Sequence, residues 1–147
     1  MAVREELRTG QKQNEPAALK ASGKVQLCSF WELSEISADV RLFVVRQRPR
    51  TLPDGWVWVP QMAPSEELFC RYRTWVRAGQ WPAKWPEYER QFKAEMSAMQ
   101  RYLDRVEEHL QAGRSVALAC YCQDPVQCHR KIFGEYFRTK GYPVNFA

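Results

Sequence analysis

The chain has 147 residues, of which 45% are hydrophobic and 13% aromatic. This length accommodates one ordinary domain and excludes two, and the apolar content excludes a disordered chain. Lys and Arg outnumber Asp and Glu by 22 to 17, so the net charge is +5. An excess of this size permits a nucleic acid or a phosphorylated small molecule as partner without demanding either.

No apolar run approaches the roughly 20 residues that cross a bilayer. The first ten residues, MAVREELRTG, lack the apolar core of a secretory signal. We therefore expect a cytoplasmic protein with no membrane partner, in which thiols stay reduced. Three of the five cysteines fall within nine residues. This crowding argues against a disulfide framework and leaves metal binding, thiol chemistry and core packing open.

The first third of the chain predicts a tail and two strands. Residues 1–23 are polar and are interrupted by glycine and proline, which predicts a flexible N-terminal tail before a single domain over 24–147. Alternating residues predict a strand over 24–30, and an apolar run predicts a second strand over 40–45. Three arginines follow within 46–50. They form either a solvated loop or an anion-binding edge, since guanidinium groups match phosphate oxygens.

The middle of the chain predicts a short strand and a helix. Residues 56–59 favour a strand in which Trp56 and Trp58 either cover a small core or stack on nucleobases. A helix is expected to open at Ser65 and to end near Gly79. Its predicted inward positions are apolar and aromatic: Leu68, Phe69, Tyr72, Trp75 and Val76.

Residues 86–112 carry apolar side chains at helical spacing and predict the longest helix. Tyr88 lies in this apolar stripe and is a candidate pocket residue. Glu95 also falls inside the stripe, about 40° from its centre. Because a carboxylate on a core face needs a partner, Glu95 is interpreted either as part of a structural salt bridge or as a catalytic group.

The strongest functional signal lies in residues 115–140. The run 116–120, VALAC, predicts a strand buried on both faces. Asp124 and Pro125 then predict the start of a helix that stops at Gly141. Cysteines and a histidine crowd this strand-to-helix turn: Cys120, Cys122, Cys128 and His129, with Arg130 beside them. In α/β folds, ligands bind at the carboxyl ends of strands, and helix N-termini attract anions.

Three interpretations of the cluster stay open. Zinc accepts such ligands, but its structural sites pair two short-spaced knuckles, and this spacing does not; we expect no metal and no cofactor. Cys128, near a helix N-terminus and beside His129 and Arg130, has an environment that lowers a thiol pKa and makes a nucleophile. In the third interpretation, Cys120 and Cys128 fill the core, while His129 and Arg130 bind an anion or pin the helix to the sheet.

The run 118–137, LACYCQDPVQCHRKIFGEYF, closely resembles the signature of the domain of unknown function 488 family, in which Cys-His-Arg opens a helix after a strand and a short loop. Residues 37–50 and 85–96 resemble the family's second strand and its aromatic-rich helix. The resemblance covers roughly 25–144 and implies a compact α/β domain of bacterial or phage type, without an established biochemical role. Many relatives carry an acidic residue at the position of Cys122. The family pattern points to these site residues: Arg46, Glu95, Cys120, Cys128, His129 and Arg130.

Together these observations predict an α/β fold with one mostly parallel sheet flanked by helices, and a long helix before the central cysteine-rich strand. The predicted function is a small enzyme acting on a phosphorylated or nucleotide-type ligand. Its catalytic residues are His129 as acid or base, Cys128 as nucleophile and Glu95 as orienting carboxylate. Arg130 and Arg46 are expected to bind the anion, and the pocket residues are Cys120, Ser29 and Tyr88.

We further expect a contact between His129 and the Glu95 carboxylate, with Arg130 turned to the mouth of the cleft. Two other functions stay open. One is a non-catalytic nucleic-acid-binding module, in which arginines contact phosphates and Trp56 or Trp58 stack on bases. The other is a zinc-stabilised interaction domain. The sequence leaves the oligomeric state open.

Overall fold

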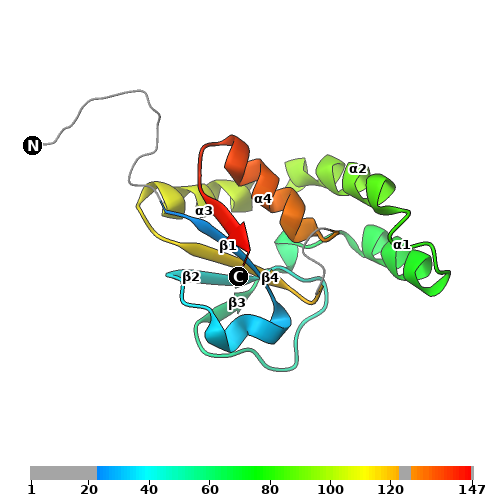
Figure 1. Ribbon diagram of the computed structural model, residues 1–147, viewed down its shortest axis with the longest axis horizontal. Helices are drawn as coiled ribbons and strands as arrows, with labels where there is room; N and C mark the ends of the chain where they lie inside the picture. Colours follow the sequence, from blue (N-terminus) through cyan, green and yellow to red (C-terminus); the bar gives the residue numbers. More distant parts are fainter. Residues whose placement is uncertain (1–22, 123–126, 147) are drawn as a thin grey trace, which may run out of the picture.

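The computed structural model describes residues 23–122 and 127–146. Its five strands form one parallel sheet in the order β3-β2-β4-β1-β5 (Figure 1). The strands are β1 (Val25–Ser29), β2 (Val40–Phe43), β3 (Trp56–Trp58), β4 (Val116–Cys120) and β5 (Val144–Phe146). The predicted α/β domain with a parallel sheet is confirmed. The predicted tail, apart from Gly23, lies outside the described residues.

Strand β4 is central because it pairs with β2 on one side and β1 on the other. All five of its residues are buried, as expected for the run of small apolar side chains that predicted it. Val116 and Leu118 belong to the larger core, while Ala117 and Ala119 belong to the smaller core. The strand therefore has two covered faces and ends at Cys120, where the candidate site begins.

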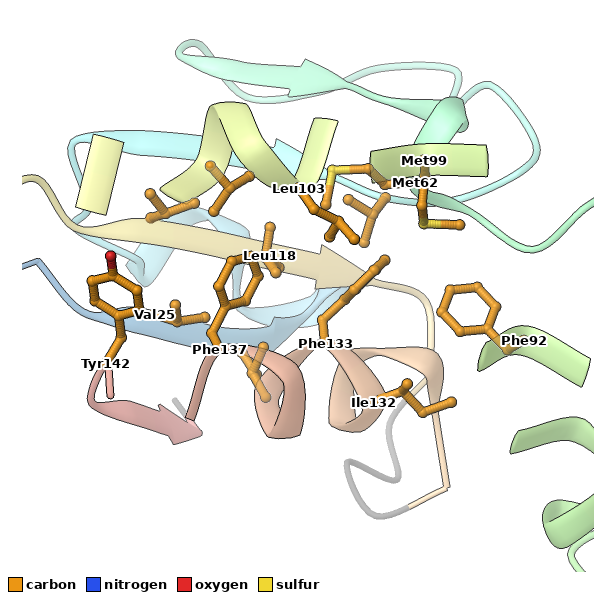
Figure 2. Close-up of a cluster of buried hydrophobic side chains, with 14 of the residues drawn as sticks. Val25, Met62, Phe92, Met99, Leu103, Leu118, Ile132, Phe133, Phe137 and Tyr142 are labelled. Atoms are coloured by element: carbon orange, nitrogen blue, oxygen red, sulfur yellow. The ribbon is translucent and has the colours of Figure 1, made fainter. Parts of the chain in front are cut away.

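Helices α3 (Gln100–Gln111) and α4 (His129–Thr139) cover the face of the larger core (Figure 1). Figure 2 shows Phe133 and Phe137 reaching from α4 toward Leu118 and Val25 of the sheet. Gly134 lets α4 approach β1 closely, because a Cβ at this position would lie 2.7 Å from Cδ1 of Leu27. Tight packing of α4 on the sheet fixes the start of this helix, where the site residues lie.

The opposite face holds the smaller core beneath the short 3-10 helix η1 (Phe30–Glu35). Trp56 is buried there, and its Nε1 donates to the carbonyl of Leu33. Nε1 of Trp58 donates to the carbonyl of Val45 at 2.9 Å. Trp56 is thus a core residue and is not free to stack on a nucleobase.

The helix expected over 86–112 runs as three segments: α2 (Trp85–Glu95), the 3-10 helix η3 (Met96–Met99) and α3. Met99, with φ −110° and ψ 17°, marks the break. The break has a packing reason, because α2 packs against α1 and α4 whereas α3 packs against β4. Among the described residues, no helix is long and apolar enough to cross a membrane.

Helix α1 (Glu66–Arg77) follows the 3-10 helix η2 (Pro60–Met62) and lies beside α2 at one end of the sheet (Figure 1). Its predicted inward face is only partly buried: Leu68 is buried, but Val76 is 46% exposed. Helix α4 begins at His129, later than the sequence predicts. The predicted cap, Asp124 and Pro125, lies outside the described residues.

Candidate functional site

A pocket of about 180 Å³ opens at the carboxyl ends of β2 and β4, where the sheet meets the α1–α2 pair. Its lining has three parts. The thiol floor consists of Cys120, Cys122, Cys128 and His129. The aromatic wall, from α1, α2 and their connection, consists of Phe69, Tyr72, Trp81 and Tyr88. The rim includes Arg46, Gln47 and Tyr121.

Cys128 is the centre of the thiol floor. It has extended backbone (φ −148°, ψ 149°) and occupies the N-cap position of α4. Its Sγ lies 2.8 Å from Sγ of Cys120 and accepts a hydrogen bond from Nε of Arg130 at 3.4 Å. Nδ1 of His129 lies 3.7 Å from the same sulfur. Several polar groups thus surround the sulfur atom of Cys128, a buried residue that lines the pocket.

The three thiols of the floor differ in their electrostatics. Burial acts to raise the pKa of Cys128, but hydrogen bonds from Cys120 and Cys122 and the charge of His129 hold this pKa well below the ordinary thiol value. Burial, helped by hydrogen bonds to the other two thiols, raises the pKa of Cys120 well above its usual range. The hydrogen bond from Cys120 lowers the pKa of Cys122, but donation to Cys128 and burial together raise it to about 12. Of these three thiols, Cys128 is therefore the one whose surroundings favour the thiolate form.

His129 is buried, and its partner differs from the one predicted. Its Nε2 lies 2.6 Å from the carbonyl oxygen of Val44, which only accepts, so Nε2 carries a proton. The predicted contact between His129 and Glu95 is wrong. Nδ1 faces the Cys128 sulfur instead. Phe92 and Phe133 pack on the ring at centroid distances of 5.4 and 5.9 Å, which fixes its orientation.

Glu95 binds the start of α1 and is not part of the thiol floor. Its two carboxylate oxygens accept from the backbone N–H of Ser65 at 2.9 Å and from the Ser65 hydroxyl at 2.5 Å. The Ser65 hydroxyl oxygen in turn accepts from the backbone N–H of Leu68, so Ser65 caps α1. Glu95 thus joins the end of α2 to the start of α1 and does not line the pocket.

Arg130 is buried, with 2% of its surface exposed, and does not face the mouth of the cleft as predicted. Its Nη2 donates to the carbonyl of Cys122 at 2.7 Å, and its Nε donates to Sγ of Cys128. Burial lowers the pKa of Arg130, but the neighbouring cysteine sulfurs reverse this effect and raise it overall. Arg130 does not line the pocket, but its contact with Sγ of Cys128 places it to stabilise a negative charge on that sulfur.

Arg46 is the arginine that reaches the pocket. Its Nε donates to the carbonyl of Pro64 at 2.9 Å and its Nη2 to the carbonyl of Pro60 at 2.8 Å. These bonds fix the guanidinium group at the rim. None of the ion pairs between described residues includes Arg46, so its charge is available to an anion.

Three further residues were predicted to form the pocket. Cys120 and Tyr88 line it, Tyr88 as a buried member of the aromatic wall. Ser29 pairs with Cys120 in the register of β1 and β4 but does not line the pocket. Its N–H and hydroxyl both donate to Glu32, which turns the side chain toward η1.

The donor atoms of Cys120, Cys128 and His129 lie within 4.8 Å of one another, a set that a soft metal ion accepts. Two thiolates on one tetrahedral zinc ion lie about 3.8 Å apart, given Zn–S bonds of about 2.3 Å. The 2.8 Å between the two sulfurs is shorter. The two sulfurs would therefore have to move apart by about 1 Å to bind one zinc ion together.

The aromatic wall was missed by sequence reasoning. Trp81 meets Tyr72 and Tyr88 edge to face, with centroids 4.9 and 5.5 Å apart, and Phe69 stacks on Tyr72 at 6.5 Å. Phe69, Tyr72 and Tyr88 had been assigned to helix faces turned toward the core or toward a pocket, and Trp81 had no role. The available signal was the density of aromatic residues in 69–92, which exceeds what one buried stripe needs.

A family model described as DUF488-N3a, the active DUF488-N3 subclade, matches residues 25–141. The match runs from β1 to just past the end of α4 and includes the thiol floor and Arg130. It confirms the resemblance indicated by the Cys-His-Arg signature. No curated protein and no solved structure matches the chain.

Proposed function

Because the chain belongs to the DUF488 family, we propose that it is a small enzyme in which Cys128 acts as a nucleophile on a nucleotide-type ligand held in the pocket. The observation that carries this proposal is the position of the Cys128 sulfur, which lies at the N-terminus of α4, accepts a hydrogen bond from Arg130 and belongs to a residue that lines the pocket. The description of the matching subclade as active also supports an enzyme over a purely structural domain.

The nucleophile is Cys128. Its sulfur accepts from Arg130 and lies at the positive end of α4, and both features stabilise negative charge there. The electron pair of the thiolate forms a bond to an electrophilic atom of the ligand while the bond to the leaving group breaks. Water then attacks the covalent intermediate and gives a proton back to His129, and the bond to the sulfur breaks, which restores the thiolate.

His129 is the proton donor in this scheme. Nε2 donates to the Val44 carbonyl, and Nδ1 faces Sγ of Cys128. A proton carried on Nδ1 is therefore placed to pass to the leaving group when the sulfur loses its charge. The carbonyl of Val44 has the orienting role that the sequence assigned to Glu95.

The pocket favours a ligand that combines a flat ring with an anion. Aromatic side chains accept the face or edge of a nucleobase. Arg46 at the rim, which forms no ion pair with another described residue, can bind a phosphate. Arg130 contributes indirectly, because it stabilises the nucleophile and does not touch the ligand.

A protection experiment tests this function. The reduced full chain is treated with iodoacetamide, and alkylation of Cys128 is followed by mass spectrometry with AMP, GMP, CMP or UMP, the matching nucleosides, or inorganic phosphate. We expect at least one nucleotide to slow alkylation of Cys128 more than its nucleoside, and phosphate to have the weakest effect. Cys70, exposed on α1 outside the pocket, is an internal control whose rate stays constant.

The variant Arg46→Ala tests whether Arg46 binds the phosphate group of the nucleotide. Charge-assisted hydrogen bonds contribute about 1.5–3 kcal/mol, so this variant should lose more than tenfold in protection by the nucleotide and little in protection by the nucleoside. Equal alkylation of Cys128 with and without every probe, in a folded protein, would contradict the proposed ligand class.

Binding of single-stranded nucleic acid is a second candidate function, favoured by the exposed aromatic residues Trp31 and Tyr121, 63% and 43% exposed. Phe30 lies between them, with ring centroids 5.4 Å from Trp31 and 5.0 Å from Tyr121. With a net charge of +5, such binding should be weak and driven by salt-sensitive phosphate contacts. Titration of labelled single-stranded DNA at two salt concentrations tests it.

A further inference from the structure

The sulfur atoms of Cys120 and Cys128 are poised for a covalent bond. They lie 2.8 Å apart, and a disulfide requires about 2.05 Å, so a small rotation of both side chains closes the gap. Each cysteine is also fixed by regular structure, one at the end of β4 and the other at the N-cap of α4. The fold therefore holds the two thiols together without any need for a large movement.

We propose that the Cys120–Cys128 pair is a site of reversible oxidation, at which a peroxide converts the two thiols into an intramolecular disulfide. The Cys128 thiolate attacks one peroxide oxygen, the O–O bond breaks, and the other oxygen leaves as hydroxide and takes a proton to form water. This yields a sulfenic acid on Cys128. Sγ of Cys120, after losing its proton, then attacks Sγ of Cys128, and the S–O bond breaks to release a second water.

Access for the oxidant comes from the pocket. Both sulfurs belong to residues that line it, although each residue is almost fully buried. A cavity of about 180 Å³ admits hydrogen peroxide, which is little larger than water. Larger oxidants meet the aromatic wall, so the site should favour a small peroxide over a bulky disulfide reagent.

The other cysteines are less suited. Cys28 does not line the pocket, its Sγ donates to the carbonyl of Leu118, and burial raises its pKa to about 12. Cys70 is exposed on α1, away from the pocket lining. The backbone carbonyl of Cys122 is fixed by Arg130, whereas the Cys120 sulfur lies 2.8 Å from the Cys128 sulfur. These differences select Cys120 as the partner of Cys128.

Reversibility follows from the charges of the reduced site. Arg130 and α4 stabilise the Cys128 thiolate, and a disulfide has no charge to offer them. Stabilising the reduced form makes a disulfide more oxidising and easier to reduce. A thiol reductant should therefore restore the pair readily. This inference goes beyond the proposed catalysis, since it requires the two thiols and a peroxide but no substrate.

The test is peptide mapping of the reduced full chain after hydrogen peroxide, under non-reducing conditions. We expect a Cys120–Cys128 link, a mass loss of two hydrogen atoms, and recovery with dithiothreitol. In Cys120→Ser the sulfenic acid should persist on Cys128 and react with dimedone. The matched controls Cys70→Ser and Cys28→Ser should form the same link as the wild type.

Other outcomes overturn the proposal. They are a link that involves Cys122 in place of Cys120, oxidation confined to Cys70, or no link in wild-type protein that a thermal melt shows to be folded. Because the wild-type map alone decides between these outcomes, a poorly folded variant does not weaken the test. Failure of nucleotides to protect Cys128 would leave this result unchanged, so the two proposals fail separately.

Discussion

The two sides of the pocket are built in opposite ways. The thiol floor lies where β4 and α4 join the core, and buried hydrogen bonds among charged and polar groups fix each atom. The aromatic wall is carried by the α1–α2 pair, and only Leu68 of α1 is fully buried. Ring-to-ring contacts hold it together. We therefore infer that the floor positions the reacting groups, while the wall shapes the ligand site and tolerates change.

Replacing Arg130 should have the largest effect on the floor. Arg130→Ala leaves the Cys128 thiolate buried without its counter-charge, and removing one partner of a buried pair costs about 3–5 kcal/mol of unfolding free energy. Chemical denaturation under reducing conditions measures the loss. Arg48→Ala is the matched control, because Arg48 is exposed and its Cζ lies 5.5 Å from the centroid of the Trp58 ring in a cation–π contact.

A double-mutant cycle with Cys128→Ser isolates the electrostatic part. Without the thiolate, loss of Arg130 should destabilise the protein much less. If Arg130→Ala lowers the free energy of unfolding equally in both backgrounds, Arg130 stabilises the fold only through its hydrogen bond to the Cys122 carbonyl. The floor then has a structural role and no electrostatic one.

His129→Ala should have the next largest effect. It leaves the buried carbonyl of Val44 without its partner, and an unsatisfied buried group costs about 1–3 kcal/mol. Thermal and urea melts measure this loss. His109→Ala is the control, since Nδ1 of the His109 side chain accepts a hydrogen bond from the exposed Arg114 on the surface. A His129 variant as stable as the His109 variant would contradict the role of His129 in fixing the floor.

The pH dependence of the floor follows from the direction of the Cys128 pKa. Because the native pKa is lowered, the thiolate stabilises the fold above the unfolded thiol pKa of 9.0, and this stabilisation is lost as pH falls through the native value. Alkylation of Cys128 should therefore begin to slow at a lower pH than alkylation of an ordinary thiol. A reference peptide thiol loses about tenfold per unit below its pKa of about 8.5. Parallel rates for the two would show that Cys128 is an ordinary thiol.

Cys28 has the opposite dependence although it is buried on neighbouring β1. Burial raises its pKa from 9.0 to about 12, so the native state keeps a proton that the unfolded state loses. Its contribution to stability is complete below pH 9 and is lost between pH 9 and about 12. Burial alone therefore does not make a cysteine reactive; hydrogen-bond donors and nearby positive charge do.

Much of the fold was predictable because it rests on local patterns. The buried run 116–120 and the alternating run 24–30 gave β4 and β1, and α1 opened at Ser65 as its cap indicated. The strand order β3-β2-β4-β1-β5 was not predictable, because pairing depends on contacts distant in sequence. The break at 96–99 contains neither proline nor glycine, so nothing local marked it.

The sequence indicated which residues line the pocket better than it indicated which atoms these residues contact. Of the six residues that the family pattern named, Cys120, Cys128, His129 and Arg46 line one pocket, whereas Glu95 and Arg130 do not; their functional role stays a prediction. The partner of His129 is a backbone carbonyl, and the partners of Arg130 are a sulfur and another carbonyl. Periodicity and charge do not reveal such acceptors. From the sequence, the expected partner of His129 was a carboxylate. The predicted contact was therefore with Glu95, and Arg130 was predicted to face the mouth of the cleft.

The smallest predicted effect concerns Glu95, which joins the two helices of the aromatic wall. Glu95→Gln replaces a carboxylate that accepts twice from Ser65 with an amide that offers one oxygen. We expect a loss of about 1 kcal/mol, as for removal of a helix cap, and an unchanged alkylation rate of Cys128. Ser65→Ala is the matched variant, because it breaks the same contact from the α1 side and should cost a similar amount. If Glu95→Gln slows alkylation of Cys128 while Ser65→Ala does not, the carboxylate acts on the floor, and the separation of floor from wall is wrong.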